Sequence, residues 1–184
     1  MEEFQVRKGP WVIIVILLMC AALLMGCGET VEPQKIDKAA TDQAPKQEPA
    51  NTQTFAVGDT VKMGDLEITL NAARWDKGNQ FSKPEAGQRW LALDCTIENQ
   101  ANQPVGVSSL MMFKLYDAEA FSCPLEIFAE TKGGLDGEVG PGRKMRGEIA
   151  FTVEEGHSAW EFIFAPNVFG FGQAIFEITE DDVQ

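Results

Sequence analysis

Histidine and clustered cysteine are nearly absent from this 184-residue chain, and both absences limit the chemistry it can perform. The single histidine, His157, lies in a turn between Gly156 and Ser158, and no nucleophile-elbow motif accompanies it. A Ser/His/Asp triad or a histidine metal site would have to use this residue, so a solvated turn histidine is the simpler interpretation. No CxxC or Cys/His cluster indicates zinc. We therefore expect no catalytic residues, no metal, no cofactor and no enzymatic activity.

Calcium is a further candidate metal, because the chain has two clusters of carboxylates. Asp117 with Glu119, and the run Glu180, Asp181 and Asp182, could supply the oxygen ligands that hard cations take. Neither stretch has the spacing of an EF-hand loop. The pattern favours a solvated acidic turn and a solvated acidic tail.

Lysine and arginine are scarce as well, with 15 against 28 acidic residues and a formal net charge of -13. Residues 1–26 hold two acids and two bases, so the rest of the chain keeps the full charge. Nucleic-acid binding needs a Lys/Arg footprint that displaces counterions from phosphates. We expect no nucleic-acid partner.

A long membrane-spanning run is missing too, although the N-terminus carries a shorter one. Fifteen apolar residues run from Trp11 to Met25 behind Arg7 and Lys8, whereas a spanning helix needs about 20. A charged start and a short apolar core are typical of a signal peptide. The run closes on Leu24-Met25-Gly26-Cys27, which resembles the lipobox of bacterial prolipoproteins. This motif predicts a lipoprotein signal peptide over residues 1–26 and lipid attachment at Cys27.

Two alternatives to this interpretation were weighed. Cys20 follows Met19, which is too bulky for the small residue that precedes a lipid-acceptor cysteine, so Cys20 is interpreted as part of the signal peptide. The other alternative is an uncleaved N-terminal anchor. A lipoprotein signal peptide and an uncleaved anchor both place the rest of the chain outside the cell, because the cations Arg7 and Lys8 lie on the N-terminal flank of the apolar run. We expect a protein of the cell membrane, held on its extracytoplasmic side by a diacylglyceryl or palmitate-type lipid anchor.

Residues 27–54 form a polar, proline-containing stretch without periodicity. Such a segment cannot bury enough apolar area to offset the entropy lost on ordering. We predict that it is the lipidated cysteine and a flexible, disordered tether, with a root-mean-square reach of about 30 Å. The globular domain is then residues 55–184.

The domain alternates apolar and polar residues with period two, which is typical of half-buried antiparallel strands. The predicted inward rows are Leu66/Ile68/Leu70, Leu91/Leu93/Cys95/Ile97, Met111/Phe113/Leu115, Phe121/Cys123/Leu125, Gly147/Ile149/Phe151/Val153, Trp160/Phe162/Phe164 and Ala174/Phe176/Ile178. A short strand over residues 57–62 precedes them. Residues 76–87 and 99–109 are predicted loops, and residues 126–144 a longer connection with room for one helical turn. Seven to eight strands and no amphipathic helix predict an all-β, immunoglobulin-like antiparallel β-sandwich.

Cys95 and Cys123 form the one candidate disulfide, since an extracytoplasmic compartment permits it. A bridge would close a loop of roughly 28 residues and stabilise by about 3 to 4 kcal/mol. The alternative is two separate buried thiols that behave as small hydrophobes. The sequence leaves both open and slightly favours the separate thiols.

Aromatic residues give one candidate binding site. Phe169 and Phe171 alternate with Gly170 and Gly172, and aromatic rings on a glycine-rich loop can form a contact patch. The alternative is that the rings cap the open end of the sandwich. The tryptophans Trp75, Trp90 and Trp160 are interpreted as packing residues rather than as a carbohydrate platform.

Five segments together resemble a known family: residues 81–93, 96–99, 113–117, 139–142 and 147–151. The pattern is similar to a family of uncharacterised bacterial lipoproteins with an immunoglobulin-like domain of unknown function, itself similar to a secreted mycobacterial immunoprotective antigen. The resemblance spans about residues 55–179 and implies a fold and a location, but no catalytic residues. Some members carry a telomeric repeat-binding label, which the acidic charge opposes here. One departure is Ala118-Glu119-Ala120, where the family's turn usually contains glycine.

These observations predict a lipid-anchored, extracytoplasmic immunoglobulin-like binding or adaptor module. Its partners would be the membrane, through the anchor, and a protein or envelope component, through the loops. The alternative is a structural accessory subunit of a membrane or envelope complex.

Overall fold

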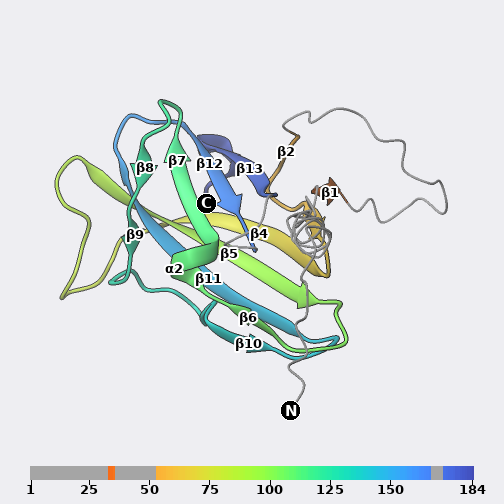
Figure 1. Cartoon of the computed structure of the whole chain (residues 1–184). Coiled ribbons are helices and arrows are strands. Elements are labelled where there is room, and N and C mark those ends of the chain that lie inside the picture. The colour runs from red at the N-terminus through yellow and green to blue at the C-terminus, as the bar shows by residue number, and fades with distance from the viewer. Residues whose placement is uncertain (1–32, 36–52, 167–171) are drawn as a thin grey trace, which may run out of the picture.

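The computed structural model describes residues 33–35, 53–166 and 172–184. The signal peptide, Cys27, most of the tether, Phe169 and Phe171 lie outside these ranges. Within the ranges the chain forms two packed sheets and a short ribbon, as Figure 1 shows, and all strand pairs are antiparallel except β2 with β13, so the predicted β-sandwich is confirmed. Seven strands have four or more residues, which matches the lower predicted count, and six shorter ones lie in the ribbon and at the sheet edges. None of the helices in these ranges is long and apolar enough to cross a membrane.

The larger sheet has six strands in the order β1-β3-β4-β5-β11-β9. Their bounds are β1 Gln34–Lys35, β3 Thr60–Met63, β4 Leu66–Asp76, β5 Gln88–Asn99, β11 Lys144–Glu154 and β9 Leu125–Glu126. The long strands form because apolar residues alternate, and the predicted row from Leu91 to Ile97 is fully buried. β1 falls inside the predicted tether, where it pairs antiparallel with β3.

The second sheet has five strands in the order β2-β13-β12-β7-β8. Their bounds are β2 Thr54–Phe55, β13 Ala174–Thr179, β12 Ala159–Phe164, β7 Phe113–Asp117 and β8 Ser122–Cys123. Its inner face supplies the aromatic half of the core, where Phe162 contacts the rings of Phe113, Phe151 and Phe176. The inward rows predicted for β12 and β13 are confirmed.

Both edges of the sandwich are closed by a chain segment that passes from one sheet to the other. β2 pairs with β13 and continues into β3, which pairs with β4, through a turn at Gly58, whose φ is +96°. On the opposite side β8 pairs with β7, and after Pro124 the chain continues as β9 against β11. Strands this short expose few free backbone groups, which protects the edges from pairing with another chain.

Several predicted boundaries were wrong. The ribbon of β6 (Val105–Val107) and β10 (Gly137–Val139) lies in segments predicted as loops, and residues 126–144 contain no helical turn. The helical turn is instead α2, Ser109–Met112, directly before β7. It takes Met111 out of the predicted inward row and leaves its side chain exposed.

The β7–β8 hairpin forms without glycine. Ala120 has a φ of +65°, the left-handed conformation that glycine usually supplies. The Asp117 carboxylate accepts hydrogen bonds from the backbone N–H groups of Glu119 and Phe121 and holds the turn. Phe121 therefore closes the turn and stays exposed, and its predicted inward position was wrong.

The acidic C-terminal tail is ordered. Residues Glu180–Asp182 form a 3-10 turn (η1), in which the Asp182 carboxylate accepts hydrogen bonds from the backbone and side chain of Thr179. Val183 then forms a parallel bridge with Ala73, and the Trp75 N–H donates to the Gln184 carbonyl. The end of the chain is thus attached to β4.

Candidate functional site

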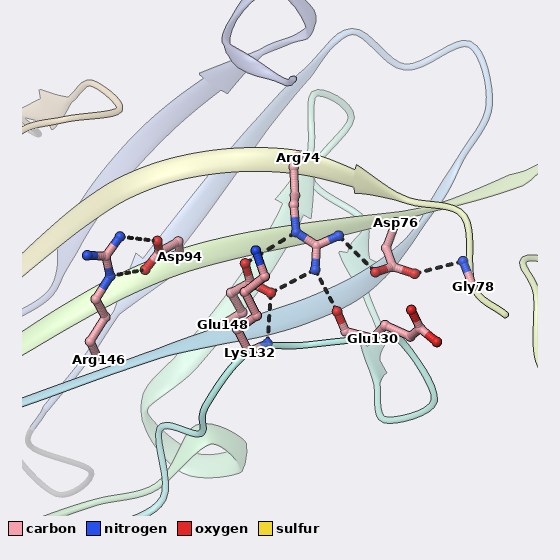
Figure 2. A network of polar contacts seen from close by, with 8 residues as sticks. All are labelled: Arg74, Asp76, Gly78, Asp94, Glu130, Lys132, Arg146 and Glu148. Atoms are coloured by element: carbon pink, nitrogen blue, oxygen red, sulfur yellow. Dashed lines mark hydrogen bonds and ion pairs between the residues drawn. The ribbon is translucent and has the colours of Figure 1, made fainter.

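The densest polar cluster of the described chain lies on the outer face of the six-stranded sheet, where Arg74 meets two buried carboxylates (Figure 2). Arg74 Nε and Nη2 donate to Glu148 Oε1 and Oε2 at 3.2 and 2.7 Å, and Nη1 donates to Asp76 Oδ2 at 2.8 Å. The side chain of Glu148 is 7% exposed and that of Asp76 is 4% exposed. We call Arg74, Asp76 and Glu148 the Arg74 clamp.

Hydrogen bonding keeps all three groups of the clamp charged. The bond from Arg74 lowers the pKa of Glu148 below its ordinary value, and the bond to Glu148 raises the pKa of Arg74. Burial disfavours the charged form of Asp76, but hydrogen bonds from Arg74 and the Gly78 N–H outweigh it and lower the pKa of Asp76. An ion pair with both carboxylates held ionised is suited to anchoring rather than to proton transfer.

The clamp attaches two loops to the sheet. Arg74 Nη2 donates to the Glu130 carbonyl at 2.6 Å, and the Lys132 N–H donates to Glu148 Oε2 at 2.9 Å, which fixes the β9–β10 connection. Asp76 Oδ1 accepts from the Gly78 N–H at 2.7 Å, which fixes the start of the β4–β5 loop. Figure 2 shows Gly78 and Glu130 reaching the clamp from these two separate loops.

Both anchored loops present large apolar side chains to solvent. Phe81 in the β4–β5 loop is 89% exposed, and Ile127 and Phe128 in the β9–β10 connection are 74% and 64% exposed. We call these three residues the apolar loop tips. Exposed apolar side chains that form one patch mark interaction sites, and these three residues are the candidates for such a contact on the two anchored loops. The chain also exposes Leu110 and Met111 on α2, and Phe121 on the β7–β8 hairpin.

The sequence did not identify the clamp or the apolar loop tips as a site. A β-bulge between Leu70 and Ala72 reverses the inward–outward phase of β4, which turns Arg74 outward and Ala73 inward. The loss of strict alternation after Leu70 was the signal for this bulge. An isolated phenylalanine at position 81, in a loop rich in Gly, Asn, Ser and Pro, was the signal for an exposed tip.

The two cysteines of the candidate disulfide are separate in the structure. Cys95 lies in β5 and Cys123 in β8, in different sheets, and both thiols are free and buried. Burial raises the pKa of Cys123 to about 11 and also raises the pKa of Cys95. Both groups are therefore thiols rather than reactive thiolates at neutral pH.

His157 has a partner, which the sequence did not predict. Its Nδ1 lies 3.2 Å from Asp117 Oδ2, so it contacts the carboxylate that holds the β7–β8 hairpin. Within residues 33–35, 53–166 and 172–184, no group of three or more His, Cys, Asp or Glu side chains is arranged to hold a metal ion.

The tryptophans pack as interpreted from the sequence. Trp160 is buried with its ring edge-on to Trp75 at 5.8 Å, and the Arg89 guanidinium lies 3.7 Å over the Trp75 ring. The Trp160 Nε1 and Arg89 Nε atoms are buried without a hydrogen-bond acceptor, and both side chains contact the Trp75 ring. Arg89 also forms a double hydrogen bond with Glu180, which attaches η1 to β5. The Arg89 cation gains a cation–π contact with the Trp75 ring at this place.

Fold and site together define an immunoglobulin-like β-sandwich with clamped, apolar-tipped loops. Residues 55–175 match a protein family described as a domain of unknown function (DUF4352). The chain belongs to this family, which confirms the family resemblance of the domain.

One curated protein is similar to the chain in sequence, and solved structures are similar to it in fold. The uncharacterised protein YxkC of Bacillus subtilis strain 168 is 29% identical over 132 residues, which are 63% of this chain and 73% of YxkC. The fold is similar to B. subtilis ycdA, described as a candidate lipoprotein, with a TM-score of 0.53 and 15% identity. That match covers 73% of this chain and 40% of ycdA. The secreted protein MPT63 of Mycobacterium tuberculosis matches with a TM-score of 0.50 and 14% identity, over 68% of this chain and 98% of MPT63.

Proposed function

We propose that this protein is an extracytoplasmic binding or adaptor module whose apolar loop tips engage a protein of the cell envelope. The observation that carries the proposal is that exposed apolar side chains lie on loops whose backbone is anchored to the sheet. Phe81, Ile127 and Phe128 are each more than 60% exposed, yet the backbone behind them is bonded to the buried Arg74 clamp. Apolar side chains on backbone that is already ordered lose little entropy on binding, which favours affinity.

A lipid anchor at Cys27 is the second part of the proposal. It is supported by the sequence Leu24-Met25-Gly26-Cys27 behind a short apolar run. The fold similarity to ycdA, described as a candidate lipoprotein, and to the secreted protein MPT63 is consistent with an extracytoplasmic location. Two acyl chains on one cysteine give stable membrane attachment.

A non-enzymatic role completes the proposal. The ionisable groups of the clamp are bonded to each other, and the buried cysteines stay protonated because burial raises their pKa. We propose neither a substrate nor a cofactor, and no nucleic-acid partner, since the net charge of -13 repels phosphate backbones.

Crosslinking on intact cells tests the loop tips. The triple variant Phe81→Ser, Ile127→Ser, Phe128→Ser is expected to lose the neighbours that crosslinking captures from the unaltered protein, while its unfolding free energy is unchanged within about 0.5 kcal/mol. Leu110→Ser is the matched control, because Leu110 is about as exposed but lies on α2 and in neither of the two anchored loops. Neighbours that survive the triple change would refute the loop tips, and neighbours that also survive the changes at Phe169 and Phe171 would favour the accessory-subunit alternative.

Phe169 and Phe171 provide a second arm of the same experiment. The double variant Phe169→Ser, Phe171→Ser tests the glycine-rich loop proposed from the sequence. If that variant loses the captured neighbours and the triple variant keeps them, the binding surface belongs to residues 169–171 instead.

Metabolic labelling with a palmitate analogue tests the anchor. We expect label on the unaltered protein and none on Cys27→Ser. Label that persists in Cys27→Ser would contradict lipid attachment at this residue.

A further inference from the structure

A polar depression of about 550 Å³ lies on the same outer sheet face as the clamp and next to it, because Asn71 precedes Arg74 in β4 and Arg146 precedes Glu148 in β11 by only two or three residues. We call its lining side chains the polar trough: Thr60, Thr69, Asn71, Thr96, Lys144 and Arg146. Its size falls within the range of small-molecule sites, about 300 to 1,000 Å³. An apolar ligand would find no hydrophobic side chain here to pack against.

Hydrogen bonds between the trough side chains orient their hydroxyl and amide groups and leave some donors and acceptors unused. The Thr60 and Thr69 hydroxyls share one hydrogen bond of 2.8 Å, which leaves one of the two O–H groups unused. Asn71 Nδ2 donates to Thr96 Oγ1 at 2.9 Å, which leaves the Thr96 O–H and the Asn71 carbonyl oxygen available. These groups can donate to and accept from the hydroxyls of a polyol.

Two cations complete the trough. Arg146 donates to the Asp94 carboxylate through Nε at 3.0 Å and through Nη2 at 2.6 Å, while Nη1 has no partner among the described residues (Figure 2). Lys144 Nζ uses one contact, to Glu98 at 2.7 Å, of the three that an ammonium can make. Both side chains are more than 60% exposed, so their remaining donors face solvent.

Charge narrows the choice of ligand. The chain carries a net charge of -13, and the two cations of the trough are paired with Asp94 and Glu98, but neither carboxylate lines the trough itself. A second depression, of about 330 Å³, shares Arg146 and adds Lys132, next to the carboxylates of Asp94 and Glu148. Cations and carboxylates thus lie side by side along this face of the sheet, and the cation donors that the carboxylates leave free suit a ligand of more than one unit that carries negative charge.

We propose that the polar trough binds an anionic, hydroxyl-rich chain, such as a polyol or glycan that bears phosphate or carboxylate groups. Arg146 Nη1 and Lys144 bind the anionic group by charge-assisted hydrogen bonds. The hydroxyls of Thr60, Thr69 and Thr96 bind the neighbouring ligand hydroxyls. This site is independent of the apolar loop tips and uses none of their residues.

Calorimetric titration of the full chain in a non-ionic detergent tests the proposal. The probes are poly(glycerol phosphate), polygalacturonate, inorganic polyphosphate and uncharged dextran. We expect poly(glycerol phosphate), polygalacturonate or both to bind at least about tenfold more tightly than polyphosphate and dextran, since both anion and hydroxyl contacts contribute. Comparison of the first two probes distinguishes a phosphate ligand from a carboxylate ligand.

Variants separate the trough from general charge attraction. Arg146→Gln and Thr96→Val are each expected to weaken binding about tenfold, and Thr96→Ser is expected to restore it because it keeps the hydroxyl. Lys114→Gln, on the outer face of the other sheet, is the matched control and should change affinity less than about twofold. Three results would overturn the proposal: no binding of either anionic polyol, equal binding of polyphosphate, or an equal loss in Lys114→Gln.

Discussion

Two arginines on one sheet face, Arg74 and Arg146, use their guanidinium groups in different ways. All three nitrogens of Arg74 bond to buried carboxylates or to the backbone of a loop, and its side chain is 30% exposed. Arg146 bonds to one carboxylate, has no partner for Nη1 in the described part of the chain and is 65% exposed. Both lie on the outer face of the six-stranded sheet, Arg74 in β4 and Arg146 in β11.

The difference suits the two arginines to different roles: structure for Arg74 and, as we propose, recognition for Arg146. A fully bonded arginine between buried carboxylates contributes stability and has no free donor for a ligand. An exposed arginine held by one carboxylate contributes little stability, because solvent screens the pair, but its orientation is fixed and a donor remains. Loss of Arg74 should therefore affect folding, and loss of Arg146 should affect binding.

Removal of Arg74 is expected to have the largest effect. Arg74→Met leaves Asp76 and Glu148 buried without their cation, and we expect a loss of about 3 kcal/mol, the lower end for a broken buried pair because Arg74 is partly exposed. Arg146→Met, the control, should lose less than about 1 kcal/mol as an exposed pair. Urea unfolding measures both, and equal losses would remove the distinction between the two arginines.

A methyl group at position 147 should have the next largest effect. Gly147 of β11 forms an antiparallel bridge with Gly133, and a Cβ there would lie 2.7 Å from the backbone of Gly134. We expect Gly147→Ala to cost about 2 kcal/mol through overpacking. Gly106→Ala is the matched control, since a Cβ there has open space around it. Urea unfolding that finds the two variants equally stable would contradict the close approach.

Lowering the pH should weaken the clamp gradually, whereas a substitution removes an ion pair at every pH. Asp76 and Glu148 have folded pKa values below their ordinary values of 3.8 and 4.5, so their contribution is complete above those values. It is lost as the pH falls through the folded pKa values, because protonation then removes the ion pairs. We expect a smaller loss than in Arg74→Met, since a protonated carboxyl still makes hydrogen bonds. Unfolding free energies measured from pH 6 downward should fall more steeply for the unaltered protein than for Arg74→Met, and parallel curves would argue against the clamp.

The smallest expected effect is a gain in stability at the β7–β8 hairpin, which lies outside the sheet face that carries the two arginines. Ala120 has a left-handed φ of +65°, so Ala120→Gly removes backbone strain but adds entropy to the unfolded chain. We expect a net stabilisation of about 0.5 kcal/mol, measured as a raised urea midpoint at unchanged slope. A lowered midpoint would mean that the hairpin gains nothing from a glycine.

The strands with regular alternation were predictable from the sequence, and the clamp was not. The inward rows of β5, β11, β12 and β13 follow from period two, and their residues are buried as predicted. The clamp depends on the register that places β4 beside β5 and β11, and Glu148 lies 74 positions from Arg74. Register over such distances is set by the whole sheet and cannot be deduced from local pattern.

Segments whose structure depends on other segments were also missed. β6 and β10 are three residues each and exist through their pairing with one another, so neither has a strand pattern of its own. Phe121 alternates with Cys123 as a strand residue would, but hydrogen bonds with Asp117 make it a turn residue. Hydrogen bonds from the turn backbone to the Asp117 carboxylate thus determined the conformation of this segment more than its apolar–polar alternation did.

The comparison of the two arginines can be tested in one NMR titration that resolves the Nε–H signals of Arg74 and Arg146. Poly(glycerol phosphate) is added to the full chain in non-ionic detergent. The account predicts that the Arg146 signal shifts during the titration while the Arg74 signal stays in place, because only Arg146 has a donor free for the ligand. A shift of Arg74 equal to or larger than that of Arg146 would contradict the account.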